Sequence, residues 1–260
     1  MSKQHERIVL VTDVANRVTR LGAFAENELV GMGEFSTPRH ITTDEALMQI
    51  ATFLGRVIGD PAPYGAVLSS VVPSHTDAWQ NALAEVVATR SLVVGPGLKT
   101  GVRMRVESPR DVGSDRVANV VAARAMHGAP VVVVSLGTTT NLEVVDNTGS
   151  FIGGAIAPGV MMGLRSLNDV AARLPLVEPQ APASVVGKNT HEAIQSGVIL
   201  GEAARVDGLL DAIVAQTGHT TPVVLTGHHA AIVAPLLRHE VLVDEALTLR
   251  GLNLIWHANH

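Results

Sequence analysis

Cysteine is absent from this chain of 260 residues, which excludes disulfide bonds, a thiolate nucleophile and any metal held by sulfur ligands. The absence is compatible with a cytoplasmic location. Aromatic residues make up only 3% of the chain, so valine, leucine, isoleucine and alanine must fill its core. With 47% hydrophobic residues, the chain has enough apolar side chains to bury a sizeable core.

A long apolar run and a basic surface are missing as well. No unbroken hydrophobic stretch approaches the ~20 residues of a membrane-spanning helix, and residues 1–6 do not have the pattern of a signal peptide. The net charge of −5 argues against nucleic acid as a partner, because binding to the phosphate backbone needs a basic surface. We therefore expect a cytoplasmic protein that acts on a small molecule, without a membrane or nucleic-acid partner.

Two strand-and-turn elements stand out in what the chain does contain. The four valines at 131–134 predict a buried strand, and the turn Ser135–Asn141 that follows holds one glycine and three threonines. Backbone N–H groups and hydroxyls in such a turn are suited to cradling a phosphate. Arg7–Thr12 predicts a second strand, followed by the polar turn Asp13–Asn16. The repetition suggests two related halves with a nucleotide cleft between them.

The rest of the chain alternates between strand and helix patterns, which predicts an α/β fold. One helix is expected to begin near Thr43, a candidate N-cap, and another to cover residues 112–126. A single long helix is expected over residues 189–216. The predicted domain boundary lies beside the helix at 112–126, giving an N-terminal domain of residues 1–116 and a C-terminal domain of residues 117–260.

Asp115, in the sequence Gly113-Ser114-Asp115-Arg116, is the best candidate for a general base. Phosphoryl transfer commonly uses a carboxylate that accepts the proton of the attacking hydroxyl, and an adjacent arginine can bind an anionic acceptor. The alternative from these four residues alone is a plain first turn of a helix, in which Asp115 answers the helix dipole and Arg116 is solvated.

Asp13 follows the first predicted strand and is a candidate magnesium ligand, because Mg²⁺ on nucleotide phosphates uses few carboxylates. Asn16 can donate to a phosphate. An Asx turn that closes a hairpin explains the same residues equally well. Gly227 stands just past a predicted strand, where a base or ribose can pack against glycine backbone. His228 and His229 are neighbours whose side chains point different ways, so a histidine metal site is not expected.

A series of motifs, taken in order, resembles the type III pantothenate kinase family of the actin, sugar-kinase and Hsp70-like superfamily. The series spans nearly the whole chain and consists of the turn at Asp13, residues 69–73 (SSVVP), 109–119 (PRDVGSDRVAN), 153–159 (GGAIAPG), 187–190 (GKNT), 193–197 (AIQSG), 225–227 (LTG) and 249–252 (LRGL). Each motif is weak alone, and together they are highly specific.

The resemblance implies two ribonuclease-H-like domains, an obligate homodimer, ATP with Mg²⁺ and usually a monovalent cation. It implies that Asp115 is the catalytic base and that Asp13 holds the metal. The implied nucleotide-binding residues are Asp13, Asn16, Arg17, Gly137, Thr138, Thr139 and Gly227. The implied acceptor-binding residues are Gly113, Ser114, Arg116, Val106 and Ala171.

Several positions depart from the family pattern. The first phosphate turn has Ala15 and Arg17 in place of glycine and threonine, and Ser135 replaces an aspartate that resembles a monovalent-cation ligand. Two polar acceptor contacts, a tyrosine and a threonine, become Val106 and Ala171. If each contact was worth ~1–2 kcal/mol, discrimination for pantothenate falls roughly 10–1000-fold.

Three hypotheses follow. The first is an ATP-dependent kinase of this fold, acting on pantothenate or, given the altered acceptor site, on a different hydroxylated metabolite. The second is a non-catalytic nucleotide-binding or regulatory paralogue, which the changes at Ala15, Arg17 and Ser135 favour. The third is a structural subunit. Retention of Asp13 and Asp115 favours the kinase, and Ser135 predicts that the kinase does not depend on potassium.

Overall fold

The computed structural model describes residues 7–59, 62–87, 89–171 and 173–260, and the chain divides into two compact units. Unit 1 comprises the residues up to 103 together with 107–122 and 246–260, and unit 2 comprises 104–106 and 123–245. The expected α/β fold built around two sheets is confirmed. The predicted boundary between residues 116 and 117 falls inside helix α3 (Ser114–His127) and stays a prediction.

Unit 1 is built on a five-stranded sheet in the order β3-β2-β1-β4-β5. Its elements are β1 (Ile8–Val14), β2 (Val18–Ala25), β3 (Glu28–Ser36), α1 (Thr43–Val57), β4 (Gly65–Ser70), α2 (Pro73–Val86), β5 (Arg90–Val93), the 3-10 turn η1 (Pro109–Asp111), the start of α3, and α8 (Leu247–Ala258). The chain runs antiparallel from β1 into β2, whereas β4 pairs parallel with β1. The carboxyl ends of β1 and β4 therefore meet at one edge of the sheet.

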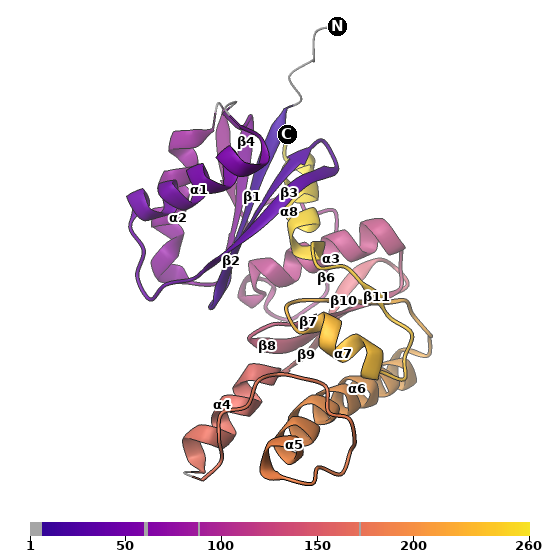
Figure 1. The fold of residues 1–260 in the computed structure, drawn as a ribbon. Helices are drawn as coiled ribbons and strands as arrows, with labels where there is room; N and C mark the ends of the chain where they lie inside the picture. The colour runs from indigo at the N-terminus through magenta and orange to yellow at the C-terminus, as the bar shows by residue number, and fades with distance from the viewer. Residues whose placement is uncertain (1–6, 60–61, 88, 172) are drawn as a thin grey trace, which may run out of the picture. The chain divides into compact units, whose positions relative to one another are not determined.

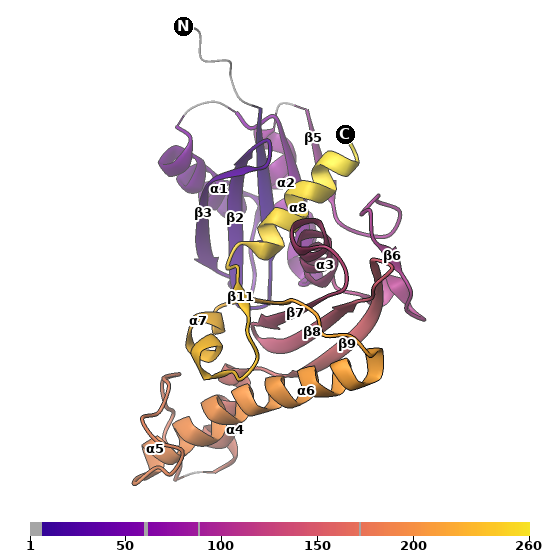
Figure 2. The same ribbon diagram turned by 90° about the vertical axis from the view of Figure 1, so that its right-hand side faces the viewer.

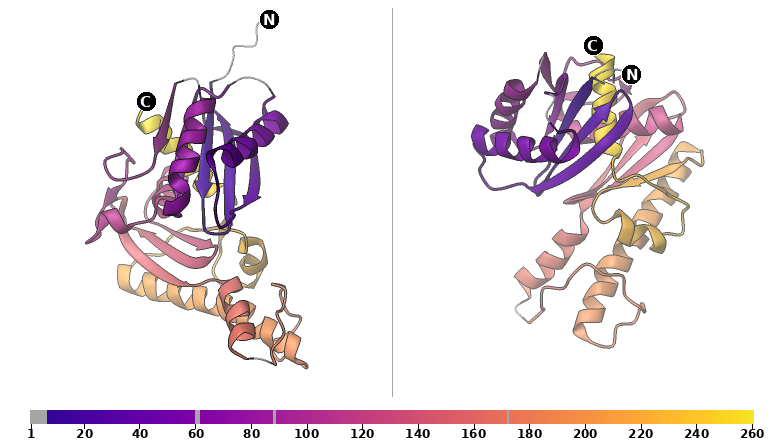
Figure 3. Two further views of the ribbon diagram at one scale, coloured as in Figure 1. Left: turned by 90° about the vertical axis from the view of Figure 1, so that its left-hand side faces the viewer. Right: turned by 45° about the horizontal axis from the view of Figure 1, so that its top comes forward.

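Helices cover both faces of this sheet. Figure 1 shows α1 and α2 side by side on one face of the sheet, with α8 on the other, and the left view of Figure 3 shows α1 and α2 in front of the strands. The core beneath α1 and α2 is mostly aliphatic, as the composition predicts, with Phe53 and Trp79 as its only aromatic members among the fully buried residues. On the other face, a Cβ at Gly65 would overlap the ring of Trp256 in α8, so glycine lets that helix approach the strand closely.

Helix α1 begins one residue earlier than expected. Thr42, and not Thr43, is the N-cap: its hydroxyl accepts from the Glu45 N–H at 3.2 Å, while the Glu45 carboxylate accepts from the Thr42 N–H at 2.8 Å. The prediction of Thr43 was wrong because a glutamate three residues after Thr42 completes a capping box that satisfies two donors at once.

Unit 2 is built on a six-stranded sheet in the order β11-β10-β7-β8-β9-β6. Its elements are β6 (Arg103–Met104), the end of α3, β7 (Val131–Leu136), β8 (Thr139–Val145), β9 (Ser150–Pro158), α4 (Val160–Val170), α5 (Thr190–Gln195), the π-helical turn η2 (Ser196–Leu200), α6 (Gly201–Thr217), β10 (Val223–Thr226), α7 (Ala230–Val233), the 3-10 turn η3 (Ala234–Leu236) and β11 (Leu242–Val243). The four valines at 131–134 are fully buried, as the sequence predicts.

Helix α6 lies along the face of strands β7, β8 and β9, as Figure 2 shows, and its buried residues share a core with theirs. The single helix expected over residues 189–216 is instead α5, η2 and α6 in succession, so a wider π-helical turn interrupts it. Such turns are common near functional sites. In the described part of the chain, no helix combines the length and apolar character needed to cross a bilayer.

Candidate active site

The first group of site residues lies where β1 and β4 end. Asp13 of β1 is the register partner of Ser69 in the parallel strand β4, and the Ser69 hydroxyl donates to Asp13 Oδ1 at 2.8 Å. Both side chains are buried, with Asp13 only 6% exposed. The sheet therefore holds this carboxyl group in a fixed position at its edge.

Asp115 belongs to the first turn of α3, and the glycine two residues earlier makes room for it. A Cβ at Gly113 would lie 2.6 Å from Asp115 Oδ1, well inside contact distance. The same oxygen accepts a hydrogen bond from the Arg116 N–H at 2.8 Å. The sequence Gly113-Ser114-Asp115-Arg116 thus fixes the carboxylate against its own backbone.

Ser114 connects α3 to the strand pair. Its Oγ lies 2.9 Å from Ser69 Oγ. The Ser69 hydroxyl donates its single proton to Asp13, so the Ser114 hydroxyl can donate to Ser69 Oγ, and it also lies 3.4 Å from the Ser70 carbonyl. A continuous hydrogen-bonded chain therefore runs from the beginning of α3 to Asp13.

The two carboxyl groups influence each other's ionisation. Burial and the charge of Asp115 raise the pKa of Asp13 to about 7, although the Ser69 hydrogen bond and Arg20 act in the opposite direction. Burial raises the pKa of Asp115 too, against the opposing effect of Arg116. Two carboxyl groups with raised pKa values in one place are a common feature of catalytic sites, since each is ready to take a proton or a cation.

The turn after β1 contains the other unit 1 residues that the resemblance assigns to the nucleotide. Asn16 is exposed, and Ala15 and Arg17 are half-buried. Among the described non-glycine residues, only Glu26 has a positive φ, so Ala15 adopts an ordinary backbone conformation. Alanine at this position therefore causes no backbone strain, and the departure from the family glycine does not distort the turn.

In unit 2, Gly137 and Thr138 form the two-residue loop between β7 and β8. The Gly159 N–H donates to the Thr138 carbonyl at 3.2 Å, and a Cβ at Gly159 would lie 2.5 Å from that oxygen. Gly227 has a φ of +97°, and its Cβ would lie 2.6 Å from the carbonyl oxygen of Leu136. Glycines from two other segments of unit 2 thus let the backbone pack closely around the end of β7 and the Gly137–Thr138 loop.

An ion pair of α6 with a buried carboxylate and a half-buried arginine supports the start of β8, next to this loop. The Thr140 hydroxyl donates to Glu202 Oε1 at 2.5 Å, Arg205 pairs with the same carboxylate, and Arg205 also donates to the Pro158 carbonyl at 2.6 Å. Burial raises the pKa of Glu202, opposed by Thr140 and Arg205. Sequence reasoning missed Glu202 and the role of Ser69, because each acts on a residue more than fifty positions away and no local pattern signals such a contact.

The other predicted site residues of unit 2 make fewer described contacts than Gly137 and Thr138 do. Thr139 donates to Asn141 Oδ1 at 3.1 Å, and Ser135 on β7 is half-buried opposite Asn141 on β8. Val106 lies beside Gly153, and Ala171 follows the last residue of α4. No described contact links Val106 or Ala171 to the Gly137–Thr138 loop.

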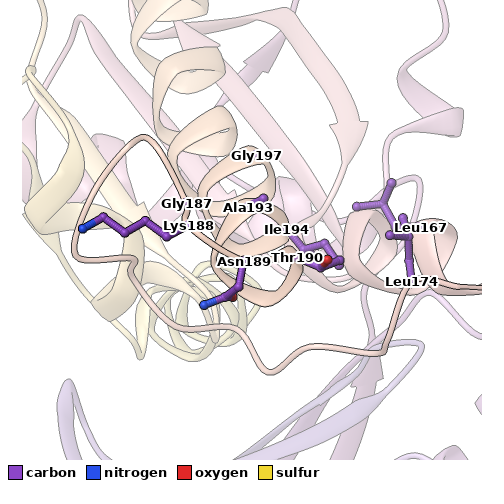
Figure 4. Close-up of a pocket in the computed structure, with 9 residues that line it drawn as sticks. All are labelled: Leu167, Leu174, Gly187, Lys188, Asn189, Thr190, Ala193, Ile194 and Gly197. Carbon is purple, nitrogen blue, oxygen red and sulfur yellow. The ribbon is translucent and has the colours of Figure 1, made fainter.

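Unit 2 also has a surface pocket of about 460 Å³, drawn in Figure 4. It is lined by Leu167, Leu174, Gly187, Lys188, Asn189, Thr190, Ala193, Ile194 and Gly197. The figure shows the Lys188 side chain extended away from the two leucines, which come from the opposite side of the pocket. The GKNT motif at 187–190 therefore borders this hollow, whereas none of the predicted site residues does.

A metal held by protein side chains alone finds no support in the described residues. They contain no group of three or more histidine, aspartate or glutamate side chains that could hold an ion. His228 and His229 belong to no such group among the described residues. Asp13 still suits magnesium, because Mg²⁺ bound to nucleotide phosphates needs only one or two carboxylates, and a cation would stabilise the charge that burial disfavours at this residue.

Comparisons with known proteins agree with the sequence motifs. A family model described as type III pantothenate kinase matches residues 9–212. The type III pantothenate kinase of Thermomicrobium roseum is 39% identical over 260 residues, which cover 97% of this chain and 98% of the relative.

Solved structures support the fold alone. The ethanolamine utilization protein EutJ from Carboxydothermus hydrogenoformans has a TM-score of 0.58 at 17% identity, covering 95% of this chain and 89% of its own. The ROK hexokinase from Thermus thermophilus has a TM-score of 0.52 at 15% identity, covering 95% and 98%. The chain therefore has the fold of actin-like and sugar-kinase-like proteins.

Proposed function

This chain belongs to the type III pantothenate kinase family, and from that premise we propose that it transfers the γ-phosphoryl group of ATP to a hydroxyl group of pantothenate. The observation that carries the proposal is the closeness of Asp13 and Asp115 in unit 1: the charge of Asp115 raises the pKa of Asp13, and the hydroxyls of Ser69 and Ser114 connect Asp13 to the residue beside Asp115. A plain helix start explains Asp115 by the helix dipole alone and does not account for its interaction with the buried Asp13.

Asp115 is the general base in this proposal. As the acceptor oxygen attacks, a bond forms to the γ-phosphorus, the bond from that phosphorus to the bridging oxygen of ADP breaks, and the hydroxyl proton passes to the Asp115 carboxylate. The carboxylate is held for this task by the Arg116 N–H and by the space at Gly113. We assign acceptor binding to Gly113, Ser114, Arg116, Val106 and Ala171.

Asp13 would hold Mg²⁺ on the nucleotide phosphates, where the ion supplies neutralisation of the phosphate charge. The Ser69 hydroxyl orients the Asp13 carboxylate for that contact. We assign the nucleotide to Asp13, Asn16, Arg17, Gly137, Thr138, Thr139 and Gly227. Because Ser135 offers a neutral hydroxyl where the family has a carboxylate, we propose that activity does not require potassium.

We also propose that the working form is a homodimer. Unit 2 carries large apolar side chains on its surface between residues 170 and 186, which a second copy of the chain would cover.

The central test is Asp115→Asn, compared with Asp111→Asn as a matched control from the exposed turn η1 four residues earlier. We expect Asp115→Asn to lower kcat with pantothenate by about 10²–10⁴-fold and to leave the Kd for ATP within a few fold, because the base contacts the acceptor and not the nucleotide. Asp111→Asn should leave both unchanged. Release of ADP measures the rate, in sodium and in potassium buffers.

The same assay separates the alternatives. A near wild-type rate for Asp115→Asn would show that another group is the base. Turnover with pantetheine, a nucleoside or a sugar but not with pantothenate would favour a different acceptor, which the losses at Val106 and Ala171 make a specific second candidate. Binding of ATP without turnover on any acceptor would favour a non-catalytic paralogue.

A further inference from the structure

Thr37, the residue that follows β3, holds both sides of the turn after β1. Its backbone N–H donates to the Arg17 carbonyl at 2.9 Å, and its hydroxyl donates to the Ala15 carbonyl at 2.8 Å. The two carbonyls flank Asn16. A single residue from a neighbouring strand thus fixes the turn at two points, and both contacts lie within unit 1.

A second threonine ties this contact to the sheet. Thr19 Oγ1 lies 2.9 Å from Thr37 Oγ1, and Thr19 is buried in β2, where it is the register partner of Val14 in β1. Because the hydroxyl proton of Thr37 is donated to Ala15, the Thr19 hydroxyl is the donor to Thr37. The chain of bonds from Thr19 through Thr37 to Ala15 therefore joins the turn to the rigid β1–β2 ladder.

Planarity of the peptide bond links these contacts to ligand binding. In a trans peptide the C=O of one residue and the N–H of the next point in opposite directions. With the Ala15 carbonyl directed at Thr37, the Asn16 N–H is directed away from Thr37. In the same way, the contact of Thr37 with the Arg17 carbonyl fixes the direction of the Val18 N–H. Val18 is the first residue of β2, directly after the turn. Holding the two carbonyls therefore sets the directions of the Asn16 and Val18 N–H groups.

We propose that Thr37 is a positioning residue for the nucleotide phosphates: the Ala15 N–H already donates to the Val18 carbonyl at 3.2 Å, and Thr37 holds the rest of the turn so that the Asn16 N–H is directed toward the phosphates. This inference rests on the proposed function, since it assumes that the turn binds phosphate. Thr37 itself touches neither the nucleotide nor the acceptor, so its loss should weaken nucleotide binding without removing the chemistry.

Three variants test the proposal by titration with MgATP and by steady-state kinetics. Thr37→Val keeps the shape of the side chain and removes its hydroxyl, whereas Thr37→Ser keeps the hydroxyl. Thr52→Val is the matched control, because the Thr52 hydroxyl also donates to a backbone carbonyl at 2.8 Å, but within helix α1. We expect Thr37→Val to raise the Kd and KM for ATP about tenfold. Thr37→Ser and Thr52→Val should stay within about threefold of wild type, and the KM for pantothenate should not change.

The outcomes distinguish this inference from the proposed function. If the wild-type protein binds MgATP and Thr37→Val binds it equally tightly, the positioning role is overturned and the kinase proposal stands. If Thr37→Val weakens ATP and pantothenate alike, or if Thr37→Ser fails to restore ATP binding, Thr37 has only a structural role and the inference is overturned. A wild-type protein that binds no nucleotide would overturn both proposals.

Discussion

Asp13 carries a raised pKa, whereas the magnesium contact proposed for it needs the ionised carboxylate. Its carboxyl group is buried and close to the charge of Asp115, and its Ser69 hydrogen bond offsets these effects only in part. A carboxyl group in this state gains from a nearby cation, which would lower its pKa again. Binding of the nucleotide with Mg²⁺ and ionisation of Asp13 should therefore favour each other.

This reasoning predicts how stability changes with pH. The folded pKa of Asp13 is about 7 and its ordinary value is 3.8, so between pH 4 and 7 the folded protein holds a proton that the unfolded chain has released. The contribution of Asp13 to the free energy of unfolding then falls as pH rises through this interval. We expect the Tm of the ligand-free protein to drop between pH 5 and pH 7.5 by on the order of 5 °C, and Asp13→Asn to flatten this dependence.

Asp146→Asn is the control for this measurement. Hydrogen bonds from Thr148 and Ser150 and the charge of Arg105 lower the pKa of Asp146, so its carboxylate is ionised throughout that range in both folded and unfolded chains. The variant should shift the Tm by a constant amount without changing its slope with pH. An unchanged slope in Asp13→Asn would mean that the pH dependence comes from another group.

At the scale of elements, the packing of α8 on α3 depends on one glycine. A Cβ at Gly251 would lie 1.9 Å from the carbonyl oxygen of Ala118, which is backbone and cannot rotate away. We expect Gly251→Ala to destabilise the protein by about 1–3 kcal/mol, because overpacking outweighs the better helix propensity of alanine.

Gly55→Ala provides the comparison within the same unit. Gly55 lies in α1, and nothing lies within 4 Å of the position its Cβ would take. Alanine there should raise the free energy of unfolding by about 0.5–1 kcal/mol. Urea unfolding of both variants measures the difference. A Gly251→Ala protein as stable as Gly55→Ala would contradict the close packing of α8 on α3.

Local features of these elements could be predicted from the sequence, and contacts across the chain could not. The buried strand at 131–134 and the helix start, predicted at Thr43 and found at Thr42, depend on neighbouring residues and were placed correctly or within a residue. The turn predicted over Ser135–Asn141 is shorter, because β7 continues to Leu136 and β8 begins at Thr139, which leaves only Gly137 and Thr138 in the loop. The chain of hydroxyls through Ser69 depends instead on the parallel register of β1 and β4, which no sequence pattern fixes. The family resemblance supplied the importance of Asp13 and Asp115, but not what holds them in place.

At the scale of the whole molecule, part of the apolar helix face that the sequence offers to a second copy is not accessible. The sequence predicts such a face from Ala193, Ile194, Val198 and Leu200. In the structure Ile194 is buried inside unit 2 and Val198 packs against Gly163, so these two side chains do not offer a surface to a second copy. The exposed apolar side chains come from the preceding segment.

Val185 and Val186 are the best candidates for the surface that a second copy covers. Their side chains are 74% and 76% exposed, yet the Val185 carbonyl accepts a hydrogen bond from the Ser196 hydroxyl at 2.6 Å, so α5 and η2 hold this segment in place. Two valines fixed in an exposed position cost free energy unless a partner buries them. We expect light scattering at micromolar concentration to give twice the chain mass of 27.2 kDa.

The double variant Val185→Glu, Val186→Glu should shift the protein toward the monomer, whereas Val30→Glu on β3 should not. A wild-type monomer would rule the dimer out, and an intact dimer in the double variant would place the interface elsewhere.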